Sequence, residues 1–193
     1  MSPSSLERRV RALLAAGEPD AATTTVLREL GPGVLGYLLA VLPGDDGLDV
    51  YSAFEVDVWR GLPGFRWESS LRGWAYRIAT HAASRALRGA YRRRRQSLPT
   101  SFASRAAAPG ATASDPGGRK ERLARLRERL SPEERTLLVL RVDRELDWVE
   151  VAAALAAGGK PAGIAALRKR FERLKDRLRV LAERELAEEA AGA

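Results

Sequence analysis

Hydrophobic positions along the chain recur every three or four residues, which is the spacing of one face of an α-helix. Between residues 22 and 42 this spacing is shown by Val26, Leu27, Leu30, Val34, Leu35, Leu38 and Leu42. Alternation of polar and apolar residues over the length of a strand is hard to find. The pattern therefore predicts an all-α protein, in which Gly31-Pro32-Gly33 kinks or splits the first long helix.

Two further helices are predicted between residues 46 and 95. The first reaches Trp59, with apolar positions at Val50, Phe54, Val58 and Trp59. Its acidic residues are Asp46, Asp49, Glu55 and Asp57, so an amphipathic helix with an acidic exterior is expected. After a loop, Ser69 or Ser70 caps a long helix that continues to about Arg95.

Residues 97–118 read as a linker between two small helical domains. The segment is rich in the residues that interrupt helices, namely Pro99, Pro109, Gly110, Pro116, Gly117 and Gly118. The predicted organisation is an N-terminal extension (1–20), a first domain (21–96), the linker (97–118) and a second domain (119–193). Leu6, Val10, Leu13 and Leu14 have helical spacing, which leaves open whether the extension docks as a helix or is a disordered arm.

The second domain is predicted to contain a helix-turn-helix. A charged helix over 119–130 precedes Ser131-Pro132-Glu133-Glu134, which has the signature of a helix start for a helix ending at Val142. Asp147 caps a short helix through Leu155, and a glycine-containing turn leads into a final helix ending near Glu189. In DNA-binding versions of this unit the second helix lies in the major groove. Its opening half carries the basic residues Arg168, Lys169, Arg170, Arg173 and Lys175.

Charge is concentrated rather than spread along the chain. The 33 Lys and Arg exceed the 25 Asp and Glu, for a net charge of +8. Between Arg60 and Arg95 there are ten arginines and a single acidic residue, Glu68. Aromatic residues are interleaved with them: Phe65, Trp67, Trp74, Tyr76 and Tyr91. Cations for phosphates and flat faces for unstacked bases are what single-stranded nucleic acid needs. Trp74, four residues before Ile78, is predicted to lie in the core, whereas Phe65 and Trp67 suit either role.

Several classes of protein are excluded or disfavoured by composition. The chain has no cysteine and one histidine, His81, so neither a thiolate metal site nor a histidine-rich one is expected. No glycine-rich phosphate loop follows a strand, and we expect a protein that is not an enzyme and uses no cofactor. No uncharged apolar run approaches the roughly 20 residues of a membrane helix. The N-terminus lacks a signal-peptide core, so a cytoplasmic protein without membrane insertion is expected.

Several short strings in the chain form a recognisable order. In the first domain they are Gly31-Pro32 to Tyr37-Leu38, Asp46 with Asp49, Trp59-Arg60-Gly61-Leu62, Phe65-Arg66, Trp74, Tyr76-Arg77-Ile78-Ala79 and Arg92 to Arg95. In the second they are Leu130-Ser131-Pro132-Glu133-Glu134-Arg135, Leu137 to Arg141, Trp148 to Ala152 and Leu167-Arg168-Lys169-Arg170-Phe171. Together they resemble the extracytoplasmic-function class of bacterial sigma factors, in which a linker joins sigma regions 2 and 4. The resemblance covers nearly the whole chain beyond residue 20.

The resemblance implies that the partners are core RNA polymerase, promoter DNA and an anti-sigma factor. The acidic helix would dock on the beta-prime clamp through Asp46, Asp49, Glu55 and Asp57, and region 4 would contact the beta flap. The family usually has Gln and Glu where this chain has Ser52 and Ala53, so which acidic residues matter stays open. Binding of core polymerase would make the chain a sigma factor that directs promoter recognition, melting and initiation.

The resemblance also implies two sets of DNA-binding residues. Those that recognise and melt the −10 element would be Phe65, Arg66, Trp67, Arg77, His81, Arg85 and Arg88. Those that read the −35 element would be Arg168, Lys169, Arg170 and Arg173, on a helix whose Leu167 and Phe171 face the core. Residues Ala156 to Lys160 form an insertion in the turn before that helix. The alternative is a helix-turn-helix regulator that binds DNA without engaging core polymerase.

Overall fold

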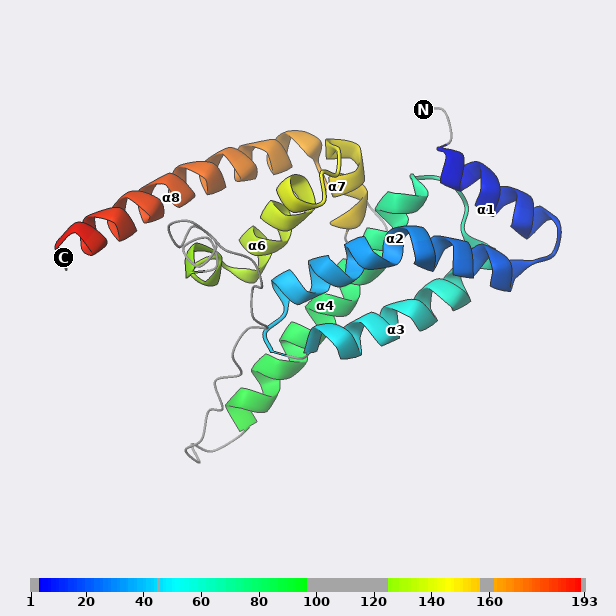
Figure 1. The fold of residues 1–193 in the computed structure, drawn as a ribbon, viewed down its shortest axis with the longest axis horizontal. Coiled ribbons are helices and arrows are strands. Elements are labelled where there is room, and N and C mark those ends of the chain that lie inside the picture. Colours follow the sequence, from blue (N-terminus) through cyan, green and yellow to red (C-terminus); the bar gives the residue numbers. More distant parts are fainter. Residues whose placement is uncertain (1–3, 45, 97–124, 157–161, 192–193) are drawn as a thin grey trace.

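The computed structural model describes residues 4–44, 46–96, 125–156 and 162–191. Across these ranges all regular structure is helical, which confirms the all-α prediction (Figure 1). The predicted linker and most of the turn insertion lie outside the described residues. No helix within the described ranges is both long and apolar enough to cross a membrane.

The N-terminal part contains α1 (Ser5–Ala15), α2 (Pro19–Val41), α3 (Asp46–Gly61), the 3₁₀ turn η1 (Leu62–Gly64) and α4 (Leu71–Gln96). Helices α2, α3 and α4 pack against one another. Their shared core is built from fully buried side chains that include Tyr37, Leu38, Phe54 and Leu62. Trp74 is also buried, as its spacing with Ile78 predicted.

A kink or a split was predicted at Gly31-Pro32-Gly33, and the split is wrong, because α2 is continuous through these residues. A proline inside a helix removes one backbone hydrogen bond and costs about 3 kcal/mol. Val34, Tyr37 and Leu38, which follow the proline, are fully buried. Packing of this apolar face keeps the residues after Pro32 in the helix despite the lost bond.

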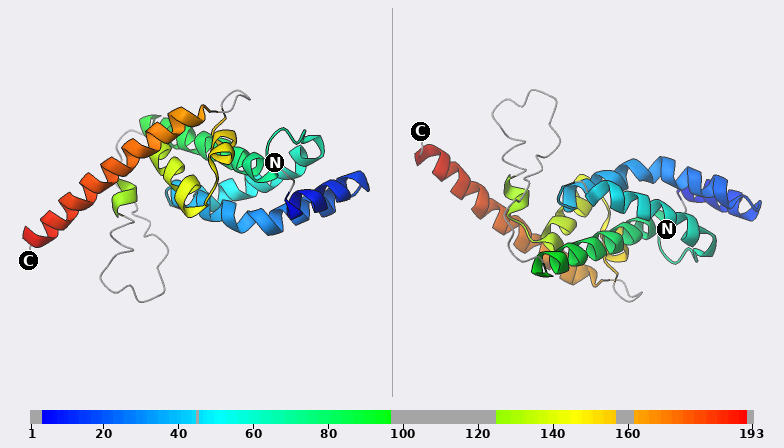
Figure 2. Two further views of the ribbon diagram at one scale, coloured as in Figure 1. Left: turned by 90° about the horizontal axis from the view of Figure 1, so that it is seen from above. Right: turned by 90° about the horizontal axis from the view of Figure 1, so that it is seen from below.

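The C-terminal part contains α6 (Pro132–Leu138), the π-helical turn η2 (Val139–Asp143), α7 (Trp148–Ala154) and α8 (Ile164–Ala191). The predicted caps are confirmed, because Ser131 and Asp147 each accept a hydrogen bond from the backbone three residues later and each forms a capping box. Helices α7 and α8 form the predicted helix-turn-helix. The later turns of α8 project away from the rest of the molecule (Figures 1 and 2).

Residues of the N-terminal extension form a docked helix. Val10 of α1 is completely buried, and Leu6, Leu13 and Leu14 pack against the hydrophobic core. The Arg9 guanidinium pairs with Glu29 of α2 at 2.8 Å. The predicted extension is therefore part of the packed core of the described structure.

Candidate nucleic-acid interface

Two aromatic rings of the loop between η1 and α4 cluster with a third ring from α4. The ring of Phe65 lies 4.8 Å from that of Trp67 and 4.9 Å from that of buried Trp74. Phe65 and Trp67 themselves are half-buried. Trp67 has a φ of 60°, a left-handed conformation that costs a bulky residue about 1–3 kcal/mol and is concentrated at functional sites. The neighbouring contacts therefore hold the loop in a strained conformation.

Helix α1 contacts this loop at Trp67 and at its junction with α4. The Glu7 carboxylate accepts a 2.8 Å hydrogen bond from the backbone N–H of Leu71, the first residue of α4. The Arg11 guanidinium lies 4.2 Å from the centre of the Trp67 ring. Ser70 accepts a 3.0 Å bond from the Gly73 N–H, which identifies Ser70 as the residue that caps α4. Neither the Glu7 contact nor the Arg11 contact was predicted from the sequence. The helical spacing of the extension indicated only that a helix could form there.

The basic residues predicted on α4 have different environments. Arg77 is half-buried, and Arg85 is exposed but pairs with Asp57 of α3 at 3.0 Å. His81 Nε2 lies 3.0 Å from the Ala156 carbonyl oxygen, to which it can donate a hydrogen bond. Arg88 is exposed. His81 is itself exposed, and its imidazole reaches a backbone carbonyl at the end of α7.

The two predicted domains pack directly on each other along α4 and α7. Arg72 pairs with Glu150 at 3.6 Å and donates a hydrogen bond to the Arg144 carbonyl. Thr80 donates a 2.6 Å bond to the Ala154 carbonyl. The interface therefore combines hydrogen bonds to backbone carbonyls with a partly buried ion pair.

Tyr37 and Tyr76 lie close to this interface, where their rings meet edge to face with 6.0 Å between centroids. Burial raises the pKa of the Tyr37 hydroxyl far above its usual range. Burial also raises the pKa of Tyr76, with a smaller opposing effect from Arg144 and Arg72. Both hydroxyls therefore stay protonated to a higher pH than that of a free tyrosine.

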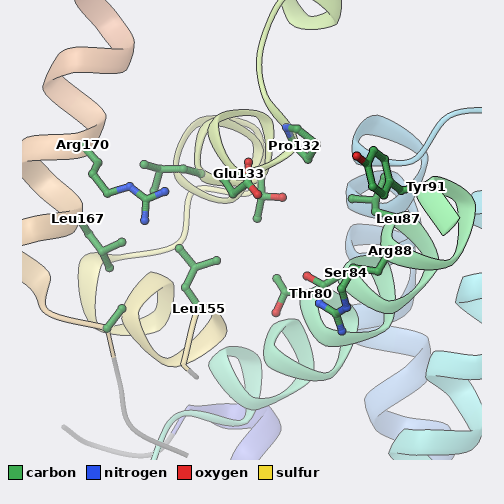
Figure 3. A pocket seen from close by; sticks show the side chains of 13 residues that line it. Thr80, Ser84, Leu87, Arg88, Tyr91, Pro132, Glu133, Leu155, Leu167 and Arg170 are labelled. Atoms are coloured by element: carbon green, nitrogen blue, oxygen red, sulfur yellow. The ribbon is translucent and has the colours of Figure 1, made fainter. Parts of the chain in front are cut away.

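A groove of about 580 Å³ lies where α4 faces α6, α7 and α8. Its apolar lining includes Leu87 and Leu155, and its charged lining includes Arg88 and Arg170 (Figure 3). Arg88 was predicted to bind the −10 element and Arg170 the −35 element. The structure brings these two predicted DNA contacts to opposite sides of one groove.

The residues predicted to read the −35 element lie on the first turns of α8. Arg168, Lys169, Arg170 and Arg173 are all exposed. Leu167 is buried as predicted, and Phe171 is half-buried with its ring 5.6 Å from that of Trp148 in α7. Contact between Phe171 and Trp148 fixes the start of α8 against the first helix of the helix-turn-helix.

The outward face of α3 is more apolar than the predicted acidic exterior. Leu48, Val56 and Trp59 are 53%, 44% and 56% exposed, although Trp59 was expected on the apolar inner side. Of the predicted polymerase contacts, Asp49 is exposed, whereas Asp46, Glu55 and Asp57 are half-buried. The indole N–H of Trp59 donates to Asp20 at 2.8 Å, which holds the ring outward against α2. This face therefore presents apolar side chains bordered by acidic ones.

Comparison with known proteins gives matches in sequence and in structure. Residues 26–94 match the family model for sigma-70 region 2. The structure of CnrH in complex with the cytosolic domain of CnrY has a TM-score of 0.65 at 20% identity, over 93% of this chain and 98% of that one. The sigma factor RpoE from Bartonella quintana, in complex with the anti-sigma factor NepR, has a TM-score of 0.68 at 18% identity, over 83% and 96%. No curated protein matches the chain in sequence.

Proposed function

We propose that the chain, whose residues 26–94 belong to the sigma-70 region 2 family, is an RNA polymerase sigma factor of the extracytoplasmic-function class. The family match carries this proposal, and the fold shared with CnrH and RpoE over most of each chain supports it. The function is one of binding and melting, for which no catalytic residue is required. The sigma factor family is in general non-enzymatic.

The outward face of α3 is the proposed contact with the beta-prime clamp of core polymerase. Exposed Trp59 and Val56 provide the apolar area that anchors an interface, and Asp49 provides charge at its edge. Asp46 and Glu55 are half-buried on the same helix, and Asp57 is paired with Arg85 of α4 at 3.0 Å. Such a surface fits a basic partner helix with apolar side chains along its centre.

Promoter melting is assigned to the loop of Phe65, Arg66 and Trp67 together with α4. Extrusion of a base costs a few kcal/mol of unstacking. Stacking on an aromatic side chain returns about 1–3 kcal/mol per base, so strand capture needs no ATP. The exposed Arg66 and Arg88 provide charges for phosphates, and the first turns of α8 are assigned to the −35 element.

Promoter binding requires the two domains to separate. The −10 and −35 elements are about 25 base pairs apart, which is about 85 Å at the rise of B-DNA. Arg88 and Arg170, assigned to these two elements, line one groove in the described arrangement. Helices α6 to α8 must therefore leave α4 before both elements are bound, and the closed arrangement is an inactive form.

An anti-sigma factor is the proposed regulatory partner. The similar sigma factor RpoE was solved with the anti-sigma factor NepR. A protein that keeps α4 and α8 together would hold the chain in its closed form. Its effect on the proposed function would be to prevent promoter binding.

Replacement of Asp49 by arginine is expected to weaken binding to core polymerase about five- to tenfold, because it places a cation against a basic partner surface. The measurement is co-elution of the full chain with sigma-free core polymerase across a concentration series. Glu183→Arg, the same charge change in the protruding part of α8, is the control and should leave affinity unchanged. Failure of the wild-type chain to co-elute would contradict the proposal and favour the regulator that does not engage polymerase.

A further inference from the structure

We infer that Arg11 of α1 is part of the single-strand binding site, where it positions the Trp67 indole and binds the phosphate beside the extruded base. This inference rests on the proposed function, because it assigns the Trp67 loop to strand capture. It extends the site into the segment before residue 26, where the family match begins.

The backbone of Arg11 is held firmly in place. Val10, its neighbour in α1, is completely buried, and Glu7, one turn earlier, bonds to the N-terminus of α4. The same Glu7 carboxylate completes the capping box of α1 with Ser4. Arg11 is thus mounted on a helix that is fixed to the first residue after the loop it touches.

The guanidinium of Arg11 is available to a ligand. The residue is exposed, and within the described ranges no carboxylate pairs with it. By contrast, Arg9 is paired with Glu29, and Arg66 lies 4.0 Å from Glu68. Arg11 is therefore the cation beside Trp67 whose charge is least compensated.

The position of the guanidinium over the indole, 4.2 Å from its centre, suits binding of a nucleotide. A guanidinium that stacks on an aromatic ring keeps its N–H donors in its own plane, where they match the oxygens of a phosphate. Arginine and an aromatic ring side by side are the pair used by sites for single-stranded nucleic acid. Trp67 would supply the stacking surface and Arg11 the adjacent phosphate contact. A residue that served packing alone would need no charge here.

The test measures binding of the full chain to a labelled pool of random-sequence single-stranded DNA over a range of salt concentrations. Arg11→Gln removes the charge at similar length and should lower affinity several-fold. It should also reduce the slope of log affinity against log salt by about 0.7, the value for one lost phosphate contact on a single strand. Arg11→Lys keeps the charge and should keep the slope, while losing part of the affinity because an ammonium does not stack as a plane. Arg9→Ala, two positions away and already paired, should leave the slope unchanged.

Several results would overturn the inference. For Arg11→Gln they are an unchanged salt slope, or tighter binding, which would mean that Arg11 covers Trp67 and competes with DNA. For Arg11→Lys the contradicting result is a reduced slope, and for the wild type it is a failure to bind the pool. Thermal unfolding of each variant shows whether α1 stays docked, and the lysine variant decides the question if the glutamine variant is destabilised. This binding assay contains no polymerase, so its outcome can be told apart from a failure of the proposed function. That failure would be seen as a lack of transcription when the chain is added to core polymerase.

Discussion

Replacement of Trp67 by alanine is expected to reduce the formation of open promoter complexes about 5- to 150-fold. The range corresponds to the loss of about 1–3 kcal/mol of stacking for one base, at 1.4 kcal/mol per factor of ten. The indole belongs to the exposed end of the Phe65, Trp67 and Trp74 cluster, so its removal leaves the buried Trp74 in place. Permanganate reactivity of unpaired thymines on duplex promoter measures the open complex.

A promoter that is already melted over the −10 element separates strand opening from other defects. The alanine variant should bind this template with a smaller loss, because only the stacking contact is lost there and not also the displacement of the base from its pair. Trp67→Phe keeps an aromatic face and should retain most of the opening activity. Equal loss on duplex and melted templates would indicate that Trp67 is structural, a conclusion that thermal unfolding would check independently.

A disulfide that joins α4 to α7 is expected to abolish promoter-dependent transcription, and reduction should restore it. The Cβ of a residue introduced at Gly73 would lie 3.2 Å from the Ala153 Cβ. The Cβ separation in disulfides is about 3.5–4.5 Å, so Gly73→Cys with Ala153→Cys needs only a small adjustment. The chain has no native cysteine, so no competing pair forms. The bond would hold Arg72 next to Glu150 and keep α7 packed on α4.

The two single-cysteine variants are the controls for this experiment, because each carries one substitution without the cross-link. Both should transcribe equally with and without reductant. The double variant should transcribe only when reduced, as followed by run-off product against the fraction cross-linked on a gel. Full activity of the oxidised double variant would show that α7 need not leave α4, and would contradict the assignment of the closed form as inactive.

Local signals in the sequence predicted much of the fold. The caps at Ser131 and Asp147 depend on residues three positions apart, and the structure has both. Burial of Trp74 and Leu167 followed from helical spacing. Such features depend on interactions within one or two helical turns, which a sequence displays directly.

Features that depend on distant residues were not predicted. Glu7 bonds to Leu71, and Ser70 lies 3.3 Å from Glu150, across separations of 64 and 80 residues. Nothing local marks such partners, because each side chain also suits an exposed position on its own helix. Periodicity likewise placed Trp59 with the inner residues of α3, whereas its bond to Asp20 of α2 draws the ring to the surface.

The proposed function requires that the chain make core polymerase initiate at promoters. The most direct measurement adds the purified chain to sigma-free core polymerase on a library of random promoter sequences, and the RNA 5′ ends are sequenced. We expect initiation that depends on the chain, from templates that share one motif near −10 and another near −35. No initiation from any template, together with no co-elution of the chain with core polymerase, would contradict it.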